Sequence, residues 1–212
     1  MDVSLLSKYF KLSEKQIEQF SKFAEIFLEK NQHINLVSRK DAENLVERHL
    51  LHSLTIGHYY DLSNAKVLDV GTGGGFPGLP LAILFENAQF TLIDAKRKKV
   101  DAVNEFAAEI GLNNVVAKHV RAEELKGNFD FIVSRAVTSL EKFTGWVHRL
   151  IKQGFHNNQA KGIIYLRGVD FDFSTINEEI NHEFDCNKII SLEEHFELDF
   201  FSSKKIVFLQ KL

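Results

Sequence analysis

The chain has 212 residues, 44% of them hydrophobic and 26% charged, which is ordinary for a globular domain with an appendage. Its formal net charge of −3 excludes nucleic-acid binding driven by a global positive field, so any such contact needs a local cluster of cations. Its single cysteine, Cys186, excludes internal disulfides and multi-cysteine metal sites. The sequence holds no secretory signal and no apolar run near the roughly 20 residues of a membrane span. We therefore expect a cytoplasmic protein with neither a membrane nor a metal partner.

The N-terminal region is predicted to be helical. A capping-box pattern at Ser13, followed by apolar residues at helical spacing, predicts a helix over 13–30. An irregular link follows, and a second helix is expected over about 41–58. No strand is predicted before residue 60. We interpret 1–60 as a helical cap that precedes a cofactor domain over 61–212.

Strands and helices alternate in the rest of the chain. The predicted strands are 67–70, 90–93, 115–120, 129–134 and 162–166, with helices over 78–85, 96–110 and 139–152. This alternation indicates an α/β fold, a Rossmann-like parallel sheet with helices on both faces. The less regular tail is expected to hold a helix near 174–182 and strands near 187–191 and 205–210.

A glycine-rich turn follows the first predicted strand. Glycine has no Cβ, so the backbone can turn sharply there and approach a ligand closely. In a dinucleotide-binding fingerprint a third glycine stands five residues after the first, but this chain has Phe76 at that position. The spacing is instead D-x-G-x-G-x-G, typical of enzymes that use S-adenosylmethionine, and its members are Asp69, Gly71, Gly73 and Gly75. An NAD-dependent enzyme is thereby disfavoured.

Other candidate site residues follow the later strands, whose carboxyl ends share one edge of the sheet. Asp94 stands 25 residues after Asp69, where a ribose-binding carboxylate is expected, although it could instead cap the helix that follows. Ala122 and Glu123 are expected beside the adenine, and Arg135 near the transferred methyl group. The alternatives are a solvated loop acid for Glu123 and a structural ion pair for Arg135.

The chain lacks the residues that activate several kinds of methyl acceptor. Both of its prolines, Pro77 and Pro80, lie beside the glycine turn, so the Asn/Asp-Pro-Pro-Tyr/Phe loop of amino-group methyltransferases is absent after the fourth strand. Cys186 comes too late in the chain to be the nucleophile used on pyrimidine C5. An acceptor that needs no activation remains, such as the lone pair of a purine N7. Catalysis would then depend on proximity and orientation.

Basic clusters provide candidate contacts for RNA, although a charge run is usually a solvated face. They are Arg39-Lys40, Arg48-His49 with His52, Lys96-Arg97-Lys98-Lys99, Arg121, Arg167 and Lys204-Lys205. Asn35 and His49 are polar groups among apolar neighbours, and such groups need partners. A structural histidine is the alternative interpretation of His49.

Four segments together resemble one family, the bacterial 16S ribosomal RNA guanine-N7 methyltransferases, also called glucose-inhibited division protein B. The segments are Asn35-Leu36-Val37-Ser38, Arg48-His49-Leu50-Leu51-His52-Ser53, Asp69 to Leu81 with its Gly-Phe-Pro-Gly-Leu-Pro-Leu end, and Ser134-Arg135-Ala136. The resemblance covers about 9–212. It implies a class I methyltransferase fold with a helical N-terminal addition. It also implies methylation of one guanine in the 530 loop, with 16S ribosomal RNA or the small ribosomal subunit as partner.

The resemblance also assigns roles to individual residues. The residues that match the family's contacts to S-adenosylmethionine are Gly71, Phe76, Ala122, Glu123 and Arg135, and the glycine spacing and the strand-end acid add Gly73, Gly75 and Asp94 to the expected cofactor site. Asn35, His49, Arg121 and Arg135 match the family's proposed RNA or active-site positions, and we expect Arg135, Asn35 and His49 at the active site. The residues expected to contact RNA are Arg121 and, from the basic clusters, Arg39, Arg48 and Arg167. The chain departs from the family pattern at His52, where an Asp is usual, and at Arg167, where a Lys is common. The second change keeps the charge but replaces a point contact with a planar fork.

Two other functions remain open at this stage. A methyltransferase that acts on a small molecule would suit the acidic net charge. A noncatalytic module that binds S-adenosylmethionine would need the glycines and the acid, but it leaves Arg135 unexplained. We expect the protein to be a monomer.

Overall fold

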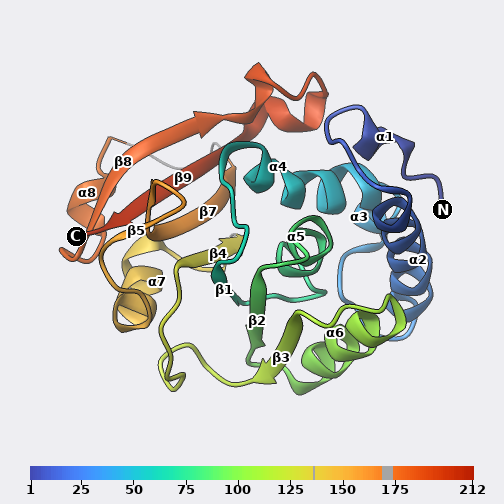
Figure 1. The fold of residues 1–212 in the computed structure, drawn as a ribbon, viewed down its shortest axis with the longest axis horizontal. Coiled ribbons are helices and arrows are strands. Elements are labelled where there is room, and N and C mark those ends of the chain that lie inside the picture. The colour runs from blue at the N-terminus through green and yellow to red at the C-terminus, as the bar shows by residue number, and fades with distance from the viewer. Residues whose placement is uncertain (136, 169–173) are drawn as a thin grey trace.

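The computed structural model describes residues 1–135, 137–168 and 174–212, with Arg39 described by its backbone alone. In these residues one seven-stranded sheet has the order β3-β2-β1-β4-β7-β9-β8 (Figure 1). The strands of this sheet are β1 (Lys66–Val70), β2 (Gln89–Asp94), β3 (Val115–His119), β4 (Phe131–Arg135), β7 (Gly162–Gly168), β8 (Phe184–Ser191) and β9 (Lys204–Lys211). The first five pair in parallel, and β9 is antiparallel to both β7 and β8. The predicted Rossmann-like fold is confirmed.

Helices cover both faces of the sheet, as a mostly parallel sheet requires. In Figure 1, α2, α5 and α6 lie to the right of the sheet, and α7 and α8 lie to the left. The helices are α1 (Ser4–Ser7), α2 (Glu14–Asn31), α3 (Arg39–Ala42), α4 (His52–Tyr59), α5 (Gly78–Leu84), α6 (Arg97–Glu109), α7 (Leu140–Val147) and α8 (Ile176–Glu179). Successive residues of β1 belong to different apolar clusters, since Val67 packs on the α2 side and Leu68 on the α7 side.

The segment predicted as one helix over 41–58 is broken into pieces, so that prediction was wrong in detail. After α3 a turn intervenes, and the six-residue π-helical segment η1 (Val46–Leu51) then leads into α4. Side-chain hydroxyls compete for backbone carbonyls here, because Ser53 Oγ donates to the oxygen of His49 at 2.6 Å. Such wide turns are frequent at functional sites. His49 lies within this π-helical segment.

Other boundaries differ from prediction where local geometry outweighs the apolar pattern. The helix predicted over 139–152 ends at Val147 and continues as the 3₁₀ segment η2 (His148–Leu150). A short unpredicted hairpin, β5 (Phe155–His156) and β6 (Gln159–Ala160), follows. Its turn uses Asn157 and Asn158 at φ 48° and 63°, left-handed values that asparagine tolerates in hairpin turns. The predicted tail helix shortens to α8, while both predicted tail strands are present as β8 and β9.

The N-terminal helices share their core with the sheet. Phe23 and Phe27 of α2 pack against Phe76 of the glycine turn and Phe106 of α6, with ring centroids 5.2–5.7 Å apart. The division at residue 60 therefore stays a prediction about sequence organisation. Within the described ranges, no helix has the length and apolar character needed to cross a membrane. The same ranges hold no group of three or more His, Cys, Asp or Glu side chains arranged to bind a metal ion.

Candidate active site

The glycine turn connects β1 to α5 and needs glycine at its first position. The amides of Gly71 and Thr72 both donate to the carbonyl oxygen of Ile93 in β2, at 2.9 and 3.0 Å. Gly71 has φ 72°, and a Cβ there would lie 2.6 Å from Cγ2 of Val137. Any other residue would be strained and would also collide. The turn thus brings bare backbone to the carboxyl edge of the sheet.

A cavity of about 400 Å³ opens beside this turn, and we call it the cofactor cavity. It lies beyond the carboxyl ends of β1, β2 and β3, where open α/β sheets bind their ligands. Its lining residues are Val70, Gly71, Ile93, Asp94, Ala95, Lys96, Lys99, Val120, Arg121, Ala122, Glu123, Val137 and Trp146. Four residues predicted to bind the cofactor are brought together here, namely Gly71, Asp94, Ala122 and Glu123.

Asp94 ties the turn to the start of α6. Its Oδ2 accepts the amide of Gly73 at 3.0 Å and its Oδ1 accepts the amide of Lys96 at 2.8 Å. The N-cap residue of α6 is Lys96. Asp94 therefore contacts the start of the helix from two residues before the N-cap, not as the N-cap residue itself. Each carboxylate oxygen can accept a further hydrogen bond. Asp94 can therefore hold the turn and still meet a ribose hydroxyl.

Asp69 is completely buried within β1 and has a structural position. Its Oδ2 accepts the amide of Gly78, the first residue of α5, at 2.9 Å. Burial raises the pKa of Asp69 to about 7, and the hydrogen bond from Gly78 opposes that rise. A Cβ at Gly78 would lie 2.7 Å from this oxygen, so the contact needs glycine. Asp69 holds the turn against the helix rather than facing the cofactor cavity.

A second cavity, of about 300 Å³, lies at the end of β4, and we call it the basic cavity. It is lined by Asp41, Arg48, His49, His52, Arg135, Leu166, Arg167, Gly168, Phe200 and Lys204. Among these described residues four are cationic and one is a carboxylate, in a protein whose net charge is −3. The carboxylate, Asp41, is held by Ser38 Oγ at 2.6 Å and lies 3.3 Å from Nη1 of Arg48. The described lining of this cavity is therefore predominantly cationic.

Arg135 connects the basic cavity to the glycine turn. Its Nη2 donates to Nδ1 of His49 at 2.9 Å and its Nη1 to the carbonyl of Arg48 at 3.3 Å. Its guanidinium carbon lies 5.5 Å from the ring centroid of Phe76, in cation–π range. Three separate contacts thus orient one cation at the strand end.

The chemistry of His49 follows from this contact. Arginine has no acceptor, so Nδ1 of His49 must accept and the ring proton must sit on Nε2. Burial, with the charge of Arg135, lowers the pKa of His49 to about 3. Burial also lowers the pKa of Arg135, to about 10, which still leaves it charged at neutral pH. His49 is therefore a neutral acceptor that orients Arg135, with no proton to exchange near pH 7.

The remaining predicted site residues fall in different places. Arg48 and Arg167 line the basic cavity, whereas Arg121 lines the cofactor cavity. Asn35 is exposed in the link after α2 and lines neither cavity, and Arg39 is described only by its backbone in α3. Gly73 and Gly75 shape the turn at φ 59° and 97° without lining the cofactor cavity, and the ring of Phe76 is buried against α2. The Ala136 of the Ser-Arg-Ala segment lies outside the described residues.

His52, where the family pattern has an Asp, is buried beneath the basic cavity. Its ring meets Phe200 and Phe201 edge-to-face, with centroids 5.3 and 5.9 Å apart. Burial lowers the pKa of His52 well below its ordinary value, so it is neutral. An aromatic contact thus stands where the pattern would place a charge.

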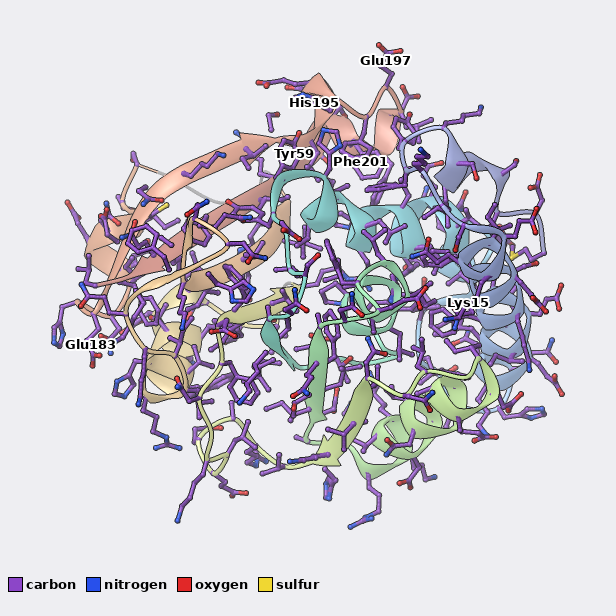
Figure 2. The ribbon with its side chains drawn as sticks, in the orientation of Figure 1. Lys15, Tyr59, Glu183, His195, Glu197 and Phe201 are labelled. Carbon is purple, nitrogen blue, oxygen red and sulfur yellow. The ribbon has the colours of Figure 1, made fainter. Side chains whose placement is uncertain are left out.

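Sequence reasoning missed aromatic residues at both cavities. Trp146 of α7 lines the cofactor cavity, and Phe200 of the 3₁₀ segment η4 (Asp199–Ser203) lines the basic cavity. The connector between β8 and β9 reaches the site because it docks on α4. In Figure 2, Phe201 lies near Tyr59 and His195, and the Tyr59 hydroxyl is 2.8 Å from Nδ1 of His195. The solitary tryptophan was a usable signal, but one phenylalanine among 19 was not.

Comparison with known proteins identifies the family. The model of the family described as rRNA small subunit methyltransferase G matches residues 16–170. A ribosomal RNA small subunit methyltransferase G from Christiangramia forsetii is 44% identical over 212 residues, which cover 99% of this chain and 97% of that protein. Another from Flavobacterium johnsoniae is 45% identical over 204 residues, 95% of each chain.

A solved structure adds an independent view of the fold. A SAM dependent methyltransferase from Aquifex aeolicus superposes with a TM-score of 0.57 at 16% identity, over 83% of this chain and 100% of that chain. At this identity the likeness shows the fold alone. The family match supports S-adenosylmethionine, predicted from the glycine spacing, as the methyl donor. The chain belongs to the rRNA small subunit methyltransferase G family.

Proposed function

We propose that the protein transfers a methyl group from S-adenosylmethionine to N7 of a guanine in the 530 loop of 16S ribosomal RNA. The observation that carries the proposal is the position of Arg135. It lines the basic cavity, while Val137, two residues later, lines the cofactor cavity. A donor and an acceptor placed in these cavities would approach each other at the end of β4.

The cofactor cavity fits the proposed donor. It combines the Asp94 carboxylate, which can accept hydrogen bonds from ribose hydroxyls, with apolar surface from Val120 and Trp146. The backbone at Gly71 is bare, because a Cβ there would collide with Val137. Ala122 and Glu123 lie after β3, where they can meet an adenine edge. When bound, S-adenosylmethionine supplies an electrophilic methyl group. Arg121 lines this cavity, so its proposed contact with RNA would be made at the cavity's rim.

The basic cavity suits an acceptor that needs no deprotonation. His49 is neutral and its Nδ1 is occupied by Arg135, so it is not poised as a general base. A purine N7 carries a free lone pair at neutral pH and therefore needs no general base. Arg135 has guanidinium donors beyond those given to His49 and Arg48, and arginine is well suited to the O6 edge of guanine. Orientation of the base would supply most of the rate enhancement.

The helices before residue 60 contribute directly to this acceptor side. We treat 1–60 as the cap that delivers Arg48 and His49 to Arg135, and 61–212 as the domain that binds the donor. Asn35 and Arg39 would lie on the approach of the RNA rather than at the base. We also propose that the enzyme acts as a monomer in the cytoplasm.

The proposal is tested by incubating the protein with methyl-labelled S-adenosylmethionine and, separately, purified 16S ribosomal RNA, small ribosomal subunits and a metabolite extract. The RNA should come from cells that lack this protein. Label in RNA, with a primer-extension stop in the 530 loop after cleavage at 7-methylguanosine, is expected. Label confined to the metabolite fraction would instead favour a small-molecule acceptor.

A further inference from the structure

The connector between β8 and β9 places an aromatic side chain in the basic cavity. In Figure 1 this connector lies beside α4, at the top of the molecule. Phe200 of η4 lines the cavity together with Lys204, the first residue of β9, and Arg48 of η1. Both Phe200 and Lys204 lie beyond residue 170, where the family match ends. Phe200 has none of the roles assigned above, and Lys204 is a candidate RNA contact by its charge alone.

Two cations lie within cation–π range of the Phe200 ring. Nζ of Lys204 is 4.7 Å from the ring centroid, and the guanidinium carbon of Arg48 is 5.7 Å from it. The ring itself is fixed by its neighbours. It meets Phe201 at 5.1 Å and 79°, and His52 at 5.3 Å and 82°. A ring held in this way restricts the positions that the side chains of Arg48 and Lys204 can take.

The charge of the cavity explains why such positioning is needed. Among the described lining residues, four are cations, Arg48, Arg135, Arg167 and Lys204, and one is a carboxylate, Asp41. Each of these cations lies over an aromatic ring, with 4.7–5.7 Å between its charged atom or guanidinium carbon and the ring centroid. The histidines of the cavity add no charge, because burial lowers the pKa of His49 to about 3. A phosphate group is an anion small enough to accept hydrogen bonds from several such cations at once.

We propose that the basic cavity binds a backbone phosphate adjoining the acceptor nucleotide, and that Phe200 is the positioning residue that holds Arg48 and Lys204 for it. The proposal rests on the proposed function, in which RNA is the acceptor. It adds a third chain segment, the β8–β9 connector, to RNA recognition. The phosphate would fix the strand while Arg135 meets the base.

Conservative substitutions of Phe200 test the role of its ring. Phe200→Leu keeps apolar bulk but removes the π face, whereas Phe200→Tyr keeps the face. Phe155→Leu is the matched control, because Phe155 is 70% exposed in the β5–β6 hairpin and lines neither cavity. Loss of the ring contacts should raise the KM for 16S ribosomal RNA about five-fold, with kcat and the Kd for S-adenosylmethionine little changed. Phe200→Tyr and Phe155→Leu should match the wild type.

Salt dependence provides a second readout that a merely structural role would not change. Removing one phosphate contact lowers the slope of log K against log salt by about 0.7 for a single strand. Lys204→Gln should show that loss, and Phe200→Leu a smaller one. An unchanged KM and slope in Phe200→Leu would overturn the proposal. So would a fall in kcat alone, because Phe200 would then act through Arg135 rather than through a phosphate.

A binding experiment separates this proposal from the proposed function. Protein loaded with S-adenosylhomocysteine is titrated with guanosine 5′-monophosphate and with guanosine. Tighter binding of the monophosphate, weakened in Phe200→Leu and retained in Phe155→Leu, is expected. Equal binding of the two, or no binding of either, would contradict the phosphate site even if ribosomal RNA is methylated. If ribosomal RNA is not methylated, a monophosphate preference that depends on Phe200 would still support the site.

Discussion

Arg135→Lys tests most sharply how the acceptor side works. Lysine keeps the charge but loses the planar fork that donates to His49 at 2.9 Å and to the Arg48 carbonyl at 3.3 Å. Hydrogen bonds from a charged group contribute about 1.5–3 kcal/mol each. If the orientation given by one of them is needed only in the transition state, its loss slows methyl transfer by roughly 10- to 100-fold.

The assay should separate kcat from cofactor affinity. Because Arg135 lines the basic cavity and not the cofactor cavity, the Kd for S-adenosylmethionine should change little in Arg135→Lys, as measured by calorimetry. Wild-type kcat in this variant would refute the orienting role. Loss of cofactor binding would instead show that Arg135 holds the donor, as the sequence resemblance implied.

Variants of His49 provide the matched pair for this experiment. Asparagine can place an oxygen near the position of Nδ1, so His49→Asn should retain more kcat than His49→Phe, which has no acceptor for Arg135. Equal activities in the two would contradict the role of His49 as an acceptor. Thermal unfolding of both variants checks that the fold persists.

Three further predictions concern pH and the glycine turn. Burial raises the pKa of Asp69 to about 7 from an ordinary value near 3.8. The group therefore stabilises the fold fully at low pH and loses that contribution as the pH rises from about 4 toward 7. The melting temperature of the wild type should fall over this pH range relative to that of Asp69→Asn. In Gly71→Ala the new Cβ would lie 2.6 Å from Val137 on a backbone with a φ of 72°. Calorimetry should show the affinity for the cofactor reduced at least about ten-fold. Adding Val137→Ala removes the collision but not the backbone strain, so the double variant should recover only part of that affinity. Since the pKa of His49 is about 3 and that of Arg135 about 10, kcat should be flat from pH 6 to 9, and a step near pH 6.5 that disappears in His49→Asn would contradict the neutral histidine.

The sequence predicted the central sheet well because each of its strands carries a strong local signal. The apolar run before Gly71 is buried on both faces, and the acid at the end of β2 lies where the spacing placed it. The capping box at Ser13 is present, with its hydroxyl accepting the Gln16 amide at 3.3 Å. The strand, the acid and the capping box were all predictable because each depends on residues close together in the sequence.

The basic cavity could not be predicted in the same way, because it is assembled from distant segments. Phe200 reaches it only because the β8–β9 connector packs on α4, a contact between residues more than a hundred positions apart. The turn between α3 and η1 was also missed, because helical periodicity alone favours a continuous helix over 41–58. Asn35, singled out by its pattern, is exposed instead.

The central claim is that two cavities meet at the end of β4 so that an unactivated ring nitrogen can accept a methyl group. The most direct measurement is methyl transfer from labelled S-adenosylmethionine to small-subunit RNA lacking the modification, mapped by cleavage at 7-methylguanosine and primer extension. The account predicts one stop, in the 530 loop, that disappears with Arg135→Ala although that variant remains folded. Transfer to another position, or an undiminished stop with Arg135→Ala, would contradict it.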